Sequence, residues 1–206
     1  MNTLALECST PSGSIAARSN GEQVFSERFT AERGHGSALF AVLERALETL
    51  GKCDQVIVGL GPGSYSGVRI AIAAAMGLEI GLDCSLAGIP SIAAIETEEK
   101  SYLVVGDARR QQFFLARVDD GLITEGPILL PLSELEQRAA SMGPLPVFSS
   151  APIAGLPLLS IAFPSAEVLA RHGEQRRGII ATGRLEPLYL REPHITQPRE
   201  VKKTAV

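Results

Sequence analysis

Short apolar runs separated by turn residues begin the chain, a pattern that is typical of β-strands. Three strands are predicted, at residues 3–8, 13–18 and 23–29. The motifs PSG and SNGE stand between them, and connections this tight predict an antiparallel meander. Leucine and alanine then recur at helical spacing over residues 37–50, with Ser37 as the expected N-cap and Gly51 as the stop.

Between residues 55 and 97 the chain alternates between continuous apolar runs and apolar residues at helical spacing. Residues 55–59 and 85–90 are continuous apolar runs, which predicts strands that are buried on both faces. Helices are predicted over residues 66–82 and, more briefly, 91–97. Three strands, helix, strand, helix, strand and helix together form a mixed α/β unit over residues 1–99.

Residues 100–206 repeat this order in a reduced form. The predicted elements are a strand pair from about residue 101, a helix at 133–141, a strand at 146–152 and a helix at 164–173. Ser133 and Glu136 have the spacing of a capping box, and Ser165 is the expected N-cap of the later helix. We therefore predict two related domains, 1–99 and 100–206, followed by an irregular tail.

Composition restricts the class of protein. The 206 residues carry a net charge of −4 with scattered Lys and Arg, so no broad basic surface is expected to hold nucleic acid unaided. The chain has three cysteines far apart in the sequence, a number and spacing that indicate neither a set of disulfides nor a CxxC metal-binding motif. The N-terminus lacks a basic leader pattern, and charges, glycine and proline interrupt the apolar stretch 70–95. We expect a cytoplasmic protein without a membrane span.

The segment GLGPGSYSGVRIA, residues 59–71, places glycines between a predicted strand and a predicted helix. Free backbone N–H groups and the positive helix end suit a phosphate there, yet the spacing matches neither GxxxxGK[ST] nor GxGxxG. The motif ECSTPSG offers a second small-residue turn beside an acidic group, and GDARRQQ offers a polar strand end. Ligand binding and a purely structural role both stay open for these motifs.

The predicted helix at 66–82 is apolar around most of its circumference. Arg69 and Glu79 are its only charged residues, and they lie about 80° apart around the axis. Small residues such as Gly67 and Gly81 also keep parts of the helix thin. A helix of this kind is either buried in its own chain or docked against a partner subunit.

The order of motifs along nearly the whole chain resembles the bacterial TsaB family, also called YeaZ. The resemblance is carried by ALECSTPSGSIAA, GLGPGSYSGVRIA, AGIPSI, VVGDARRQQFFLARV and EPLYLR. It implies an α/β fold of the actin-like, sugar-kinase and Hsp70 ATPase (ASKHA) superfamily. Two related βββαβαβα-type domains are then expected, the second reduced, with a tail after about residue 190 that is free to pack back on the first.

The resemblance also implies a function and partners. The chain would be a non-catalytic scaffold subunit in the synthesis of N6-threonylcarbamoyladenosine at position 37 of tRNA. Catalysis would belong to the paralogue TsaD, with the ATPase TsaE as third component, tRNA bound indirectly, and a homodimer when the chain is alone. The docking surface would lie on the two helices of the first domain, at Leu39, Leu43, Leu47, Val68, Ala71, Ala74, Ala75 and Leu78.

Candidate nucleotide-binding residues are Glu7, Ser9, Thr10, Gly61, Gly63, Ser64, Asp107 and Arg109. Relatives usually have aspartate in place of Glu7, whose extra methylene would displace a metal-binding carboxylate. TsaD-type chains bind metal through a pair of histidines, whereas His35 stands alone here, so neither a metal site nor a peptidase is expected. No cofactor is required of this chain, and ATP or ADP at the interface of the complex stays open. The alternative hypothesis is an independent ATP-binding kinase or hydrolase of the same superfamily.

Overall fold

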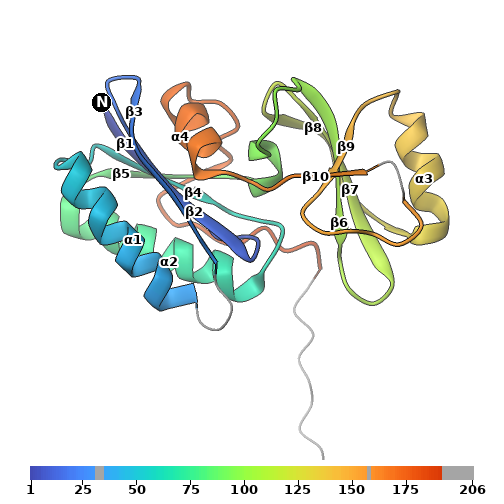
Figure 1. The fold of residues 1–206 in the computed structure, drawn as a ribbon, viewed down its shortest axis with the longest axis horizontal. Coiled ribbons are helices and arrows are strands. Elements are labelled where there is room, and N and C mark those ends of the chain that lie inside the picture. Colours follow the sequence, from blue (N-terminus) through green and yellow to red (C-terminus); the bar gives the residue numbers. More distant parts are fainter. Residues whose placement is uncertain (31–34, 157–158, 192–206) are drawn as a thin grey trace, which may run out of the picture.

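The structure, a computed structural model, describes residues 1–30, 35–156 and 159–191 and forms two β-sheets with helices packed on them (Figure 1). The first half contains β1 (Asn2–Glu7), β2 (Ser12–Ser19), β3 (Glu22–Thr30), α1 (His35–Leu50), β4 (Gln55–Gly59), α2 (Tyr65–Leu82), β5 (Ser85–Ile89) and the 3-10 helix η1 (Ser91–Ala94). The second half contains β6 (Ser101–Asp107), β7 (Gln112–Asp119), β8 (Leu122–Pro131), α3 (Leu132–Ser141), β9 (Val147–Ser149), β10 (Leu159–Ile161), α4 (Ala166–Glu174) and β11 (Ala181–Thr182). The predicted α/β class is confirmed.

The first sheet has six strands in the order β11-β5-β4-β1-β2-β3. β1, β2 and β3 pair antiparallel in sequence order, as their tight turns predict. β4 lies parallel to β1, and β5 lies parallel to β4 with α2 as the crossover between them. α1 and α2 lie side by side on the same face of this sheet (Figure 1).

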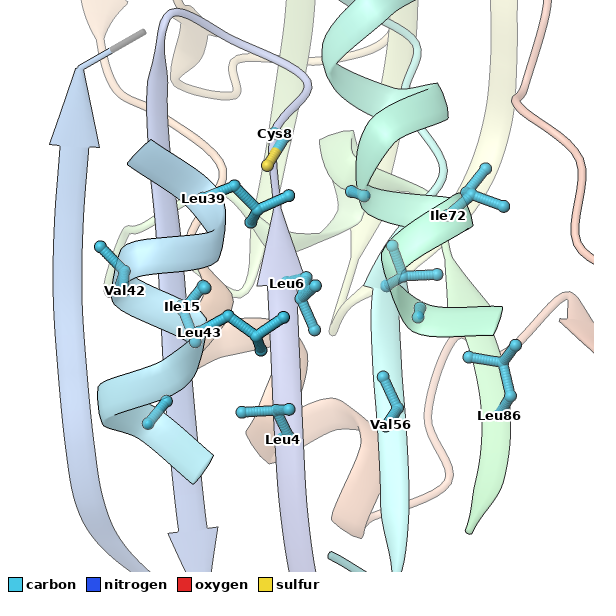
Figure 2. Close-up of a cluster of buried hydrophobic side chains, with 14 of the residues drawn as sticks. Leu4, Leu6, Cys8, Ile15, Leu39, Val42, Leu43, Val56, Ile72 and Leu86 are labelled. Carbon is cyan, nitrogen blue, oxygen red and sulfur yellow. The ribbon is translucent and has the colours of Figure 1, made fainter. Parts of the chain in front are cut away.

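Apolar side chains fill the layer between the first sheet and helices α1 and α2 (Figure 2). Leu4 and Leu6 of β1 belong to this layer together with Leu43 of α1. Because successive strand residues face opposite sides of a sheet, Ala5 lies on the other face. There α4 covers the sheet, with Leu169 completely buried.

The second sheet has five strands in the order β10-β9-β6-β7-β8. α3 packs on β7 and β8 through Leu135, which is completely buried together with Leu103 and Leu115. Tyr102 and Phe148 of this sheet belong to a second core cluster that also contains α4 and residues of the first sheet. The two sheets are therefore joined through one core around α4.

The last part of the chain, which the predicted division assigns to domain 100–206, returns to the first sheet. α4 contacts β1, β2 and β4, and β11 extends the first sheet by pairing with β5. Ala166 N donates a hydrogen bond to Ser14 Oγ at 2.9 Å, and Leu185 is buried with the side chains of α1 and α2. The chain thus returns to the first sheet by Ala166, well before residue 190, because the second face of that sheet needs a cover.

Local sequence signals place most elements correctly but fail in the second half at one cap and two short strands. α3 begins at Leu132, and its N-cap Pro131 makes no side-chain hydrogen bond, so the capping box predicted at Ser133 is wrong. Ser165 does cap α4, since its Oγ accepts from Glu167 N at 3.2 Å. β10 and β11 are missed because strands of three and two residues carry too little alternation to detect.

α1 and α2 end as predicted but begin one or two residues earlier, whereas the third predicted helix of the first half ends early. α1 begins at His35, so Ser37 lies inside the helix and is not its N-cap. Gly51 ends α1 with a left-handed backbone, φ 69°, and its N–H donates to Leu47 O at 2.9 Å. The helix expected over 91–97 is limited to the four-residue turn η1.

α2 is long and apolar enough to cross a membrane by length and composition alone, with a mean hydropathy of 1.3. One helix of this kind among the described residues is a weak indication, because core helices pass the same test. In α2 the side chains of Val68, Ala71, Ile72 and Ala75 are buried against the rest of the chain. The helix is thus part of an α/β layer in this fold.

We expect Gly173→Ala to destabilise the protein, because an added Cβ would lie 2.4 Å from Ile57 Cγ1 where α4 meets β4. Overpacking of a core typically costs about 1–3 kcal/mol. Gly81→Ala is the matched control, since no atom lies within 4 Å of its Cβ position. Alanine at an open helical position should stabilise by about 0.5–1 kcal/mol. Urea unfolding measures both free energies, and equal effects would contradict the close packing of α4.

Candidate functional site

The loops that follow β1 and β4 meet at one edge of the first sheet, because the two strands are parallel neighbours. Ser64 N donates a hydrogen bond to Ser9 O at 2.6 Å. Gly63 lies so close that a Cβ atom there would be 2.1 Å from the same carbonyl oxygen. The ECST and GPGSYSG motifs are thus brought together, as a shared site requires, but in direct contact with each other.

Glu7, the last residue of β1, is completely buried beside this contact. Its Oε1 accepts a hydrogen bond from Ser9 N at 2.5 Å, while Oε2 has no hydrogen-bond partner among the described residues. A Cβ atom at Gly59 would lie 1.9 Å from Oε2 and 2.6 Å from Ser91 Oγ. The carboxyl group therefore fills space that is open only because position 59 has no side chain. The name Glu7 cluster is used below for Glu7, Ser9, Gly59, Gly63 and Ser64.

Burial raises the pKa of Glu7 above its ordinary value, and the neighbouring hydroxyls of Ser9 and Ser91 and the N–H of Ser9 oppose this only in part. A raised pKa favours the protonated, neutral acid. Hard divalent cations bind to ionised carboxylates, so a neutral acid in a closed space is a poor metal ligand. The geometry suits a carboxyl group that holds two loops together.

Several backbone N–H groups at and near the start of α2 have partners within the chain. Ser64, its N-cap, accepts a hydrogen bond from Gly67 N through Oγ at 3.3 Å. Gly61 N donates to Ser91 Oγ at 3.0 Å. Together with Ser64 N, these N–H groups are among the donors that a bound phosphate would use at a helix start. Their partners inside the chain favour the structural interpretation of the glycine-rich loop.

Thr10, Asp107 and Arg109 do not join the Glu7 cluster. Thr10 Oγ1 donates to Ser12 O at 3.0 Å within its own turn. Asp107 ends β6 in the second sheet, where its Oδ1 accepts from Arg109 N at 2.7 Å. Among the described residues, no hydrogen bond or ion pair connects Asp107 or Arg109 with the Glu7 cluster. Sequence proximity to a strand end therefore does not bring all eight candidates to one site.

Five residues predicted to contact a partner are completely or almost completely buried in the core of this chain: Leu39, Leu43, Val68, Ala71 and Ala75. They face the first sheet, because the apolar stripe of a helix is the side that covers a sheet. Leu47, Ala74 and Leu78 are half-buried at the border of that core. The assignment of the five buried side chains to a docking surface is corrected accordingly.

The exposed side of α2 is formed by residues that the sequence analysis did not single out. Ala73, Gly77, Ile80 and Leu82 are exposed, Ile80 by 83% and Leu82 by 41%. Ala73, Gly77 and Ile80 follow one another at helical spacing and so share one side. Phe40 on the neighbouring α1 is 55% exposed. Ala73, Gly77, Ile80 and Phe40, all without charge, are named the outer helix surface; Leu82 lies about 160° from Ile80 around the axis and is not part of it.

We expect Glu7→Gln to be more stable than the wild type at about pH 8, with a difference that shrinks toward pH 4.5. The folded-state pKa of Glu7 lies above 4.5, so its contribution to stability is lost as pH rises through the folded-state pKa. The loss is at most about 1.4 kcal/mol per pH unit, and a neutral amide avoids it. Urea unfolding across this pH range measures the difference.

The control for this experiment is Glu98→Gln, at an exposed position. It should keep the pH dependence of the wild type, because its carboxylate is in water in both states. If the Glu7→Gln stability profile runs parallel to that of the wild type, Glu7 is not a neutral acid in the folded protein.

Sequence comparison relates the chain to proteins of tRNA modification. Residues 29–126 match the family model described as "TsaD: tRNA N6-adenosine threonylcarbamoyltransferase". Uncharacterized proteins of Mycobacterium bovis and Mycobacterium tuberculosis are 31% identical over 204 residues, which cover 92% of this chain and 92% of theirs. The tRNA threonylcarbamoyladenosine biosynthesis protein TsaB of Haemophilus influenzae is 29% identical over 128 residues, or 57% of this chain and 54% of that protein.

Two solved structures from Pseudomonas aeruginosa share the fold. One is described as an uncharacterized protein with similarity to peptidase YEAZ; its TM-score is 0.73 at 23% identity, covering 92% of this chain and 99% of that one. The other, YeaZ, has a TM-score of 0.70 at 23% identity with the same coverage. Together with the sequence relatives, these matches show that the chain belongs to the TsaB (YeaZ) family.

Proposed function

We propose that this chain is a non-catalytic subunit of the machinery that makes N6-threonylcarbamoyladenosine in tRNA, and that it docks a TsaD-type catalytic subunit. The observation that carries the proposal is the uncharged outer helix surface on α1 and α2. Family membership and the biosynthetic role named for the Haemophilus influenzae relative support this pathway. The proposal includes TsaE as third component, a homodimer of the isolated chain and a cytoplasmic location.

The outer helix surface has the composition of an interface. α2 contains two charged residues: Arg69 lies one turn before Ala73 on the same side of the helix, and Glu79 lies about 100° from Ile80 around the axis. A solvent-facing helix on a sheet normally carries a polar side, so Ile80 at 83% exposure is costly unless a partner covers it. Ala73 and Gly77 are small, which lets a partner helix approach the backbone closely. Association through this side therefore removes apolar area from water at a low steric cost.

The Glu7 cluster supports a non-catalytic role. A closed-in carboxyl group whose pKa is raised by burial, and the pairing of Gly61 N and Gly67 N inside the chain, make this cluster a poor holder of a nucleotide and its metal ion. Among the residues that the structure describes, no three His, Cys, Asp or Glu side chains gather as a metal site needs. We therefore favour the scaffold over an independent kinase, hydrolase or peptidase, and place any ATP or ADP at the interface with the partner.

Replacing Ile80 by glutamate should weaken docking to the TsaD protein of the same organism by about 10–100-fold, because a carboxylate would be desolvated without a partner. Ile161→Glu is the matched control, since Ile161 is 48% exposed on β10 of the other sheet. Calorimetric titration of the two purified proteins measures both affinities, and circular dichroism checks the fold. Failure of the wild-type chains to associate at micromolar concentration would sink the proposed function.

Titration of the isolated chain with ATP and magnesium should release no binding heat at millimolar nucleotide. The reason is that the loop after β4 closes on Ser9 and on its own helix N-cap. ATP added to the preformed complex with TsaD is the companion measurement, because it reports a site at the interface. Saturable binding by the isolated chain, abolished by Gly63→Val, would favour the independent ATP-binding enzyme instead.

A further inference from the structure

The last described segment of the chain, residues 188–191, connects the two halves of the molecule (Figure 1). Leu188 N donates a hydrogen bond to Leu60 O at 2.7 Å, beside the loop after β4. Leu188 packs against the core under α1 and α2, and Leu190 against the core around α4. Tyr189, between these two leucines, is exposed, and Arg191 is half-buried.

Tyr189 lies beside the first turns of α2. Its ring centroid is 5.8 Å from that of Tyr65, and the two residues are 45% and 59% exposed. The guanidinium of Arg69 lies 5.1 Å from the Tyr65 ring centroid and donates a hydrogen bond to Tyr65 Oη at 2.6 Å. Two aromatic rings and a cation thus form one exposed platform.

Arg191 extends this platform to the second sheet. Its Nη2 donates to Gln112 Oε1, and Gln112 N donates to Arg109 O at 3.2 Å. Arg109 and Arg110 form the turn between β6 and β7, and the side chain of Arg109 is 88% exposed. A continuous line of contacts therefore runs from α2 through the tail to two arginines of the other sheet.

The arginines along this line differ from most others in their surroundings. Ion pairs with carboxylates are formed by Arg18, Arg28, Arg45, Arg117, Arg138 and Arg177. Among the described residues, no carboxylate lies within 4.0 Å of Arg69, Arg110 or Arg191. Arg109 has Asp107 at 3.5 Å, in an exposed pair that contributes little. Positive charge that the described residues do not neutralise attracts an external anion.

We propose that the line Tyr65, Arg69, Arg109, Arg110, Tyr189 and Arg191, named the arginine–tyrosine stripe, binds unpaired nucleotides of RNA directly. The inference rests on the proposed function, in which tRNA is the substrate of the complex. Arginines contact the phosphates and fix the register of the strand, while tyrosine rings stack on the bases. The stripe adds a direct contact to the indirect tRNA association that the charge balance of the whole chain predicts.

Two properties favour RNA over an acidic protein segment as the occupant. Exposed rings next to guanidinium groups match the alternation of bases and phosphates in a single strand, and guanidinium binds phosphate in a bidentate manner. The net charge of the chain is −4, so the rest of the surface repels a polyanion and directs it to the stripe. A carboxylate-bearing peptide would use the arginines but would leave the two tyrosine rings without a matching partner.

Fluorescence anisotropy of a labelled single-stranded RNA of about 12 nucleotides, with the isolated chain titrated in, tests the proposal. Four phosphate contacts on a single strand predict a slope of log affinity against log salt of about −2 to −3. A duplex RNA of the same length should bind more weakly, because its bases are already stacked. Binding that saturates with this salt dependence is the expected result.

Variants separate the two kinds of contact. Arg109→Gln combined with Arg110→Gln should weaken binding about tenfold and reduce the magnitude of the salt slope by about one to two. The matched control combines Arg28→Gln and Arg138→Gln, which removes the same charge from two exposed ion pairs elsewhere. Tyr189→Ala should lower the affinity for RNA about tenfold and leave the salt slope unchanged. Tyr189→Phe should bind RNA with the affinity of the wild type.

Several outcomes overturn the inference. The first is the absence of saturable RNA binding at low salt. The second is an equal loss of RNA affinity in the stripe variants and the control variants, and the third is equal affinity for single-stranded and duplex RNA. Loss of docking to TsaD in the stripe variants with RNA affinity unchanged would show a protein-binding surface instead. Because Ile80→Glu tests docking independently, a chain that binds RNA but not TsaD would refute the proposed function and leave the stripe standing.

Discussion

The carboxyl group of Glu7 occupies the space that Gly59 leaves at the end of β4, and the arrangement of this sheet edge depends on that contact. The Glu7 carboxyl group accepts a hydrogen bond from Ser9 N and so fixes the loop after β1. Ser9 O in turn accepts a hydrogen bond from Ser64 N, where α2 begins. An ionised carboxylate without a counter-charge is costly at this depth, so burial raises the pKa of Glu7. Hydrogen bonds within the chain therefore set the position from which α2 leaves the sheet.

The two sides of α2 follow from that position. Gly67, Ala71 and Ala75 are small and lie against the sheet, so the helix approaches β4 closely and needs few large apolar residues for its core. Large apolar residues such as Ile80 are then left on the exposed side, where the core does not use them. The same composition that makes the helix apolar overall thus packs one side of α2 on the sheet and leaves the other side, the outer helix surface, for the proposed partner subunit.

Helices and strands whose patterns lie within their own residues can be predicted from the sequence, whereas contacts between segments far apart in the chain cannot. Alternation and helical spacing place β1 to β5, α1 and α2 within a few residues, because each pattern is complete inside its own element. The return of α4 and β11 to the first sheet carries no local signal, since it is decided by the uncovered face around Ala5. Burial of Glu7 likewise depends on Gly59, far along the chain. The outer helix surface could be predicted from the 100° rotation per residue once Ala71 and Ala75 are known to face the sheet.

α2 separates the two proposed interactions along its own length. Arg69 and Ile80 are eleven positions apart, which corresponds to about 16 Å along the axis at a rise of 1.5 Å per residue. The end with Tyr65 and Arg69 also carries the positive pole of the helix dipole, which favours phosphate, whereas the end with Ile80 presents uncharged side chains. Because Ala73 follows Arg69 by only four positions, the proposed protein partner and RNA strand would lie next to each other on α2 while contacting different residues. Holding both on one rigid helix would restrict their relative orientation, which is the contribution that the proposed non-catalytic role requires.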